Sequence, residues 1–152
     1  MIVGNRLVES GDAGVILAMG SHRNRVENNI FSRNGDAGVV VEDSDSAEII
    51  NNTAHLSSDA GVSLNTSNHS VVLDNDVRFN PTGVAVSGND NTIEGNDADG
   101  NDGTGIEVGS GSLRNRIVGN EASGTESDGI VVQGDALHPV TGDPLDGNLV
   151  QG

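Results

Sequence analysis

A period of about 23 residues runs through this sequence and limits what the chain can fold into. Two independent markers keep the period: an asparagine, and a glycine that is followed by valine or isoleucine. Successive markers are 21 to 24 residues apart through six repeats. The asparagines are Asn5, Asn29, Asn52, Asn75, Asn96 and Asn120, and the glycines are Gly14, Gly38, Gly61, Gly83, Gly105 and Gly129. Repeats of this length are small structural units that become stable only when they stack on one another.

Four columns of apolar residues appear when the repeats are aligned on these markers. Every repeat has an apolar residue three positions before the asparagine, two after it, directly after the glycine and two further on. None of these 24 positions is polar. The last two columns are two residues apart, which is the period of a strand. In the second repeat the pattern predicts short strands near residues 24–28, 30–32 and 38–42.

The sequence therefore predicts one all-β domain over residues 1–152, a parallel β-solenoid of about six coils with three short strands per coil. Stacking places equivalent strands about 4.8 Å apart and creates the core between them. Leucine-rich repeats share the period and an asparagine column. They also need an apolar residue five positions before the asparagine. This chain has mostly polar residues there, which disfavours the leucine-rich fold: Asn24, Ala47, Ser70, Asn91 and Asn115.

The recurring asparagines are expected to have two structural roles. Asparagine tolerates the left-handed backbone conformation that a sharp corner between strands requires. Its amide can also form hydrogen bonds with the same amide one coil above and below, which would make a ladder along the solenoid. We therefore interpret Asn5, Asn29, Asn52, Asn75, Asn96 and Asn120 as structural residues and not as ligands.

The cleanest copies of the repeat are segments 91–96 (NTIEGN) and 115–120 (NRIVGN). The unit resembles the right-handed parallel β-helix repeat family, which includes NosD-like periplasmic proteins, alginate epimerases and polysaccharide lyases. The resemblance covers essentially the whole chain and implies a right-handed parallel β-helix. It also implies an extracellular, cell-surface or periplasmic location. The motif consists of core and corner residues, so it does not define an activity.

The charge and composition exclude some partners. The formal net charge is −16, and there is no lysine to form the basic surface that nucleic acid requires. Insertion into a membrane is not expected, because no long apolar segment occurs. The absence of cysteine excludes disulfides and thiolate metal sites.

Two groups of residues are candidates for chemistry. His55, Arg78 and Asp99 share an outward column on three successive coils. A base, a cation and a carboxylate on one face suit proton abstraction from an acidic sugar, as in the lyases and epimerases that the repeat resembles. A chance surface cluster is the competing interpretation.

The second candidate is a column of carboxylates at Asp12, Asp36 and Asp59, two residues before the glycine. Like charges at one strand spacing repel each other. A bound Ca²⁺ would relieve the repulsion, and it is the only cofactor that the sequence suggests. The competing interpretation is a solvated turn.

The first and last residues match the same strand of the repeat, and neither end has a polar cap. This pattern indicates a segment of a longer solenoid whose uncapped ends can pair with another chain. The one clear insertion is a loop near residues 135–147, which contains His138.

The function expected from these observations is a non-catalytic β-helix scaffold or carbohydrate-associated module of an exported or cell-surface protein, with a polysaccharide as its partner. One alternative is part of a polysaccharide lyase or uronate epimerase. A NosD-like periplasmic metal-insertion protein is the other, and it is disfavoured because cysteine is absent and there are only two methionines.

Overall fold

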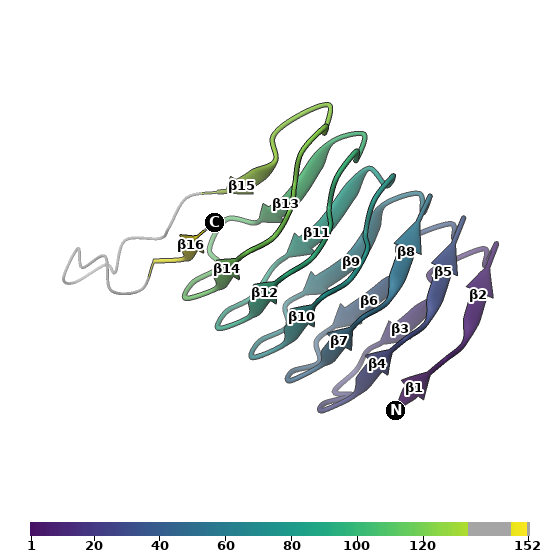
Figure 1. Ribbon diagram of the computed structural model, residues 1–152. Coiled ribbons are helices and arrows are strands. Elements are labelled where there is room, and N and C mark those ends of the chain that lie inside the picture. The colour runs from purple at the N-terminus through teal and green to yellow at the C-terminus, as the bar shows by residue number, and fades with distance from the viewer. Residues whose placement is uncertain (134–146, 152) are drawn as a thin grey trace.

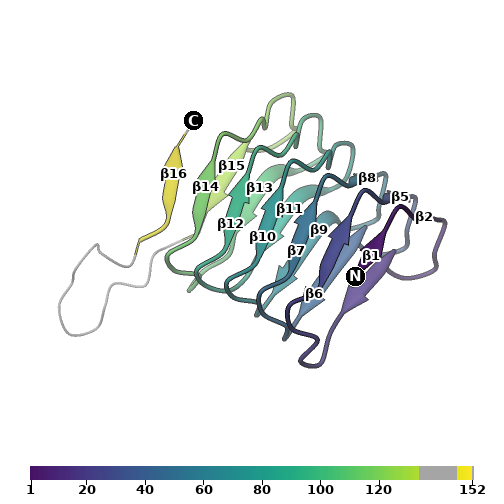
Figure 2. The ribbon, with the colours of Figure 1, turned by 60° about the horizontal axis from the view of Figure 1, so that its bottom comes forward.

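A computed structural model describes residues 1–133 and 147–151, which form a stack of β-coils without a helix (Figure 1). The chain passes in turn through three parallel sheets, named A, B and C here, and one passage through all three makes one coil. The N- and C-terminus lie at opposite ends of the stack in both views (Figures 1 and 2). No helix of the described residues is long and apolar enough to cross a membrane. Apart from its last residue, the insertion predicted near 135–147 lies outside the described residues.

Each sheet collects one strand from successive coils. Sheet A contains β1 (Ile2–Val3), β4 (Arg25–Glu27), β7 (Glu48–Ile50), β10 (Val71–Leu73), β12 (Thr92–Glu94), β14 (Arg116–Val118) and β16 (Leu149–Gln151). Sheet B contains β2 (Arg6–Val8), β5 (Ile30–Ser32) and β8 (Thr53–His55). Sheet C contains β3 (Val15–Leu17), β6 (Val39–Glu42), β9 (Ala60–Asn65), β11 (Thr82–Val86), β13 (Thr104–Val108) and β15 (Ile130–Val132).

The predicted solenoid is confirmed. The three strands expected in the second repeat are β4, β5 and β6. All pairings are parallel, and they join equivalent positions of neighbouring repeats, for example Val26 with Ile49 and Ile49 with Val72. Beyond β8 the pairing in sheet B narrows to single residues, and isolated bridges join Thr53, Asp76, Asp97 and Glu121 in sequence.

One apolar core fills the interior of the stack. All four predicted apolar columns belong to it, and the largest fully buried side chain is Phe31. Only members in the end coils are partly buried: Ile2, Leu7, Ala122, Ile130 and Val132. The core therefore forms between coils and ends where the stack ends.

The recurring glycine allows sheets B and C to approach closely. A Cβ added to Gly105 would lie 2.6 Å from the carbonyl oxygen of Gly129 and 2.7 Å from the Cβ of Ala122. The same crowding recurs at Gly83, where the carbonyl oxygen of Gly105 would be 2.4 Å away. No side chain fits at either position without movement of the backbone.

The six asparagines form a continuous ladder inside the corner between sheets A and B. The backbone N–H and the side-chain amide of Asn52 both donate to Asn75 Oδ1, at 2.9 and 3.0 Å. Equivalent pairs of bonds join Asn5 to Asn29, Asn29 to Asn52, Asn75 to Asn96 and Asn96 to Asn120. The ladder therefore satisfies polar groups that the stacked coils bury.

The expectation that these asparagines adopt the left-handed conformation is wrong. The preceding residue does so, with φ between 51° and 68°, and these residues are Gly4, Asn28, Asn51, Asp74, Gly95 and Gly119. The amide of the ladder asparagine points inward, and the left-handed residue before it turns the chain from sheet A to sheet B.

The corner between sheets C and A has its own left-handed column. It consists of Arg23, Ser46, His69, Asp90 and Arg114, with φ between 55° and 59°. Backbone N–H groups in this column donate to carbonyls of the next coil, as Ser46 does to Asn68 at 2.9 Å. Hydrogen bonds between coils thus hold a conformation that these residue types seldom adopt.

Candidate functional site

The outer face of sheet B carries the catalytic candidates. His55 ends β8, whereas Arg78 and Asp99 lie two residues after the bridging residues Asp76 and Asp97 on the next two coils. His55 Nε2 lies 2.6 Å from Asp76 Oδ1. Arg78 donates from Nε to Asp76 Oδ1 and from Nη2 to Asp76 Oδ2, both at 2.8 Å. The structure thus joins His55 to Arg78 through Asp76.

Asp99 belongs to a different set of contacts. Its Oδ1 accepts hydrogen bonds from the backbone N–H and the hydroxyl of Ser123, at 2.5 and 2.9 Å. Its own N–H donates to Asp97 Oδ1 at 3.2 Å, and Asp97 Oδ2 lies 3.2 Å from Arg78 Nε. Among the hydrogen bonds and ion pairs of the described residues, Asp99 is linked to Arg78 through Asp97, and its charge also acts on Arg78 from a distance.

Asp76 is the electrostatic centre of this face. Burial alone would raise the pKa of Asp76, but hydrogen bonds from Arg78 and His55 outweigh burial and hold that pKa below its usual value. The bond to Asp76 in turn raises the pKa of Arg78 above its usual value. Arg78 and Asp76 are therefore both charged at neutral pH.

Phe79 completes this group, and we call His55, Asp76, Arg78 and Phe79 the sheet B cluster. The Phe79 side chain is half exposed. Its ring meets the His55 ring edge-on with centroids 5.7 Å apart, and the Arg78 guanidinium carbon lies 5.7 Å from its centroid. A histidine held by a carboxylate is suited to act as a general base. Arg78, however, already donates to both oxygens of Asp76, so its charge is partly compensated and attracts a substrate carboxylate less strongly.

Asp76 was missed by the sequence analysis. The signal was its place directly after a ladder asparagine, where the outward residues of successive repeats are Arg6, Ile30, Thr53, Asp76, Asp97 and Glu121. Reading this column beside the column of His55, Arg78 and Asp99 would have brought Asp76 between His55 and Arg78.

The three aspartates proposed for Ca²⁺ lie on successive coils. Asp12 and Asp59 are exposed and Asp36 is half-buried. The backbone carbonyl of Asp36 accepts a hydrogen bond from Ser58 N, and that of Asp59 accepts one from Thr82 N, so the main chain of this turn is tied to the next coil. In the described part of the chain, no three His, Asp or Glu side chains are grouped closely enough to hold a metal ion. Ca²⁺ binding stays a prediction.

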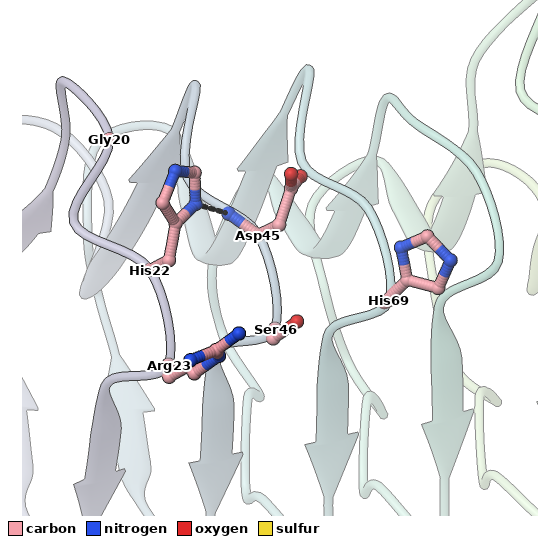
Figure 3. A pocket seen from close by; sticks show the side chains of 6 residues that line it. All are labelled: Gly20, His22, Arg23, Asp45, Ser46 and His69. Carbon is pink, nitrogen blue, oxygen red and sulfur yellow. Dashed lines mark hydrogen bonds between the residues drawn. The ribbon is translucent and has the colours of Figure 1, made fainter.

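A hollow of about 570 Å³ lies on the outside of the corner between sheets C and A (Figure 3). Residues from three successive coils line it, and we call it the corner hollow: Gly20, His22, Arg23, Asp45, Ser46 and His69. Figure 3 shows the His22 ring turned toward the backbone of the next coil, where Nδ1 accepts the Asp45 N–H at 2.9 Å. Because Nδ1 accepts, the proton of the neutral ring is on Nε2, which is left as a donor.

The acidic side chain of the corner hollow is fixed. Asp45 Oδ1 accepts the Asn68 backbone N–H at 2.8 Å and the Asn68 side-chain amide at 3.0 Å. These two bonds hold the pKa of Asp45 below its usual value.

A further polar hollow of about 310 Å³ is lined by residues of the later coils: Thr66, Asn68, Ser87, Gly88, Asn89, Ser110, Gly111 and Ser112.

Comparison with known protein families identifies the repeat. A family model described as a right-handed β-helix region matches residues 1–148. The chain belongs to the right-handed β-helix family. No curated protein and no solved structure matches it.

In this right-handed β-helix the candidate groups all lie outside the wall of the solenoid. The apolar columns and the asparagine ladder occupy the interior and repeat from coil to coil. The sheet B cluster and the corner hollow use outward positions that change from coil to coil. Family membership therefore accounts for the fold, and any activity depends on the outward residues.

Proposed function

We propose that this β-helix is a non-catalytic scaffold that associates with carbohydrate through the corner hollow. The observation that carries the proposal is the mixture of hydrogen-bonding groups around the hollow. His22 Nε2, the Arg23 guanidinium and a ring N–H of His69 are donors. The Asp45 carboxylate is an acceptor, and the Ser46 hydroxyl is both. Sugar hydroxyls need donors and acceptors side by side, and a mixed set matches them better than a set of one charge.

The rigidity of the hollow supports the same proposal. Arg23, Ser46 and His69 have the left-handed backbone of the corner, and their N–H groups are bonded to the next coil. Asp45 is held by Asn68 on the following coil. A hollow whose groups are already in place loses little conformational entropy when a ligand binds. Association with carbohydrate also fits an exported or cell-surface protein.

Calorimetric titration of the protein with neutral and uronate-containing polysaccharides tests the proposal. His69→Ala and Arg23→Ala should each weaken binding about tenfold, which corresponds to the loss of about one hydrogen bond. The matched control is His55→Ala, which removes the same side chain as His69→Ala from the sheet B cluster and should leave the affinity unchanged. Equal weakening by both histidine variants, or no binding of any polysaccharide, would refute the proposal.

The second candidate function is that of a uronate lyase or epimerase centred on the sheet B cluster. The observation that favours it is the contact of 2.6 Å between His55 and Asp76, since a carboxylate can orient a catalytic histidine. Incubation with uronate polymers, followed by detection of unsaturated or epimerised products, tests it. Products that disappear in His55→Ala would establish this function and reject the non-catalytic scaffold.

A further inference from the structure

Asparagine or aspartate stands directly before glycine at four places in the described residues, and such pairs are prone to rearrange. In these pairs the glycine nitrogen can attack the side-chain carbonyl carbon, because a glycine has no Cβ to hinder the approach. A cyclic succinimide forms, and its hydrolysis leaves an isoaspartate, in which the main chain runs through the former side chain. An asparagine loses ammonia more readily than an aspartic acid loses water, so the sequence alone points to the asparagine. The pairs are Asn34–Gly35, Asp99–Gly100, Asp102–Gly103 and Asp128–Gly129.

The peptide unit between Asp102 and Gly103 is not tied to the neighbouring coils. Neither the Asp102 carbonyl oxygen nor the Gly103 N–H has a hydrogen-bond partner among the described residues. The groups on both sides of this unit are tied, since the Asp102 N–H donates to Asn80 O at 2.8 Å and Gly103 O accepts from Ser127 N at 3.1 Å. The Asp102 side chain is exposed, so water can reach it. This unit can therefore turn toward its own carboxyl group without breaking a hydrogen bond between coils.

The pair that the sequence favours is held on both sides. The Gly35 N–H donates to Ser10 O at 2.9 Å, and the Asn34 carbonyl accepts from Ser58 N at 3.0 Å. The Asn34 side chain is buried, and its Oδ1 accepts the Ser10 N–H at 3.2 Å. Attack on this side chain requires local opening of the wall, so the fold protects the asparagine that is chemically the more reactive.

Each of the other two aspartate pairs is held by at least one hydrogen bond. The Gly100 N–H donates to Ser123 O at 2.8 Å, and Asp99 Oδ1 is bound by the N–H and the hydroxyl of Ser123. The Asp128 carbonyl accepts from Gly105 N at 3.2 Å. The pair at Asp102 is thus the one that the fold leaves free to react.

We propose that Asp102 is a site of spontaneous isoaspartate formation in the folded protein. The Gly103 nitrogen loses its proton and bonds to Asp102 Cγ, and one carboxyl oxygen leaves as water. A water molecule then opens the ring at the former main-chain carbonyl, so the two steps together consume nothing and release nothing. No enzyme or cofactor is required for this rearrangement.

The product would alter the wall at the corner between sheets B and C. Isoaspartate adds one methylene to the main chain between Asn101 and β13. Asn101 is buried, and its Oδ1 accepts the Asn80 N–H at 2.8 Å, so the coils are joined directly beside the inserted group. The modification should therefore weaken the stacking of this coil on its neighbours.

Incubation of the folded protein at neutral pH for several weeks in water enriched in heavy oxygen tests the proposal. Each opening of a succinimide adds one heavy oxygen, and proteolysis in ordinary water followed by electron-transfer fragmentation identifies the labelled residue. Asp102 should acquire label about tenfold faster than Asp99 or Asn34, because each of these must first lose at least one hydrogen bond. In urea the same incubation should label Asn34 fastest.

The matched control is Asp102→Glu, which keeps the charge at this exposed position but could cyclise only to a larger ring that forms more slowly. This variant should lose the label at position 102 and keep the labelling rates of the other pairs. Labelling of Asn34 as fast as that of Asp102 in the folded protein overturns the proposal. So does an unlabelled Asp102 over a period in which the sample in urea reacts.

Discussion

Gly105→Ala tests whether the close approach of sheets B and C is required by the fold. The new Cβ would lie 2.6 Å from the Gly129 carbonyl oxygen on the next coil and 2.7 Å from the Ala122 Cβ. Both atoms are fixed to the backbone, so a change of side-chain rotamer cannot relieve the contact. Either neighbouring coils or the two sheets must move apart.

The expected cost follows from two opposing effects. Overpacking a buried position costs about 1–3 kcal/mol, and the upper part of this range applies here because the obstacles are a carbonyl oxygen and a Cβ. Alanine also restricts the unfolded chain, which stabilises the protein by about 0.4–1 kcal/mol. The net loss in the free energy of unfolding should be about 2 kcal/mol. With a urea dependence of about 2 kcal/mol per molar, the midpoint falls by about 1 M.

Urea unfolding followed by far-ultraviolet circular dichroism measures this shift. The control is Gly109→Ala, just after the same strand β13, where a new Cβ would lie 3.5 Å from the Val86 carbonyl oxygen in ordinary contact. The backbone of Gly109 is also outside the left-handed region. The urea midpoint of Gly109→Ala should therefore stay at the wild-type value or rise by about 0.5 M at most. A midpoint of Gly105→Ala equal to that of the wild type or of Gly109→Ala would refute the reasoning.

Other variants separate the remaining contributions. Asn75→Ala should cost about 3 kcal/mol, because two donors of Asn52 lose their acceptor, and a loss below about 1 kcal/mol in urea unfolding would contradict the ladder's importance. Ile93→Ala, at a fully buried position, should cost about 2–5 kcal/mol, whereas Ile16→Ala, 48% exposed, should cost less than about 1 kcal/mol in the same measurement. The folded pKa of Asp76 lies below the ordinary value of 3.8, so its ion pairs stabilise the fold above that pH and the stabilisation is lost as pH falls through the folded pKa. Asp76→Asn should therefore flatten the acid side of the stability profile, and an unchanged acid side would argue against this contribution.

The fold was predictable from the sequence because each structural position is repeated six times. Val26 alone does not indicate a core position. The equivalent positions of the next repeats hold Ile49, Val72 and Ile93, and all four residues lie in one core. The pairing register followed as well, since equivalent residues of successive repeats must stack.

The candidate sites were less accessible, because they depend on contacts made once. The bond of His55 to Asp76 joins neighbouring outward columns on successive coils, and a comparison of one column at a time does not show it. The contact between His22 and the Asp45 N–H depends on the backbone path of a corner.

The left-handed column at the corner between sheets C and A has a consequence for how such a chain can change. Arg23, Ser46, His69, Asp90 and Arg114 differ in charge, size and hydrogen-bonding capacity, yet all five have nearly the same φ. Their main-chain N–H groups, as at Ser46 and His69, are bonded to the following coil, so the backbone does not depend on the identity of the side chain. This line of positions, about 4.8 Å apart along the rod, can acquire new surface chemistry one residue at a time while the buried wall behind it stays the same.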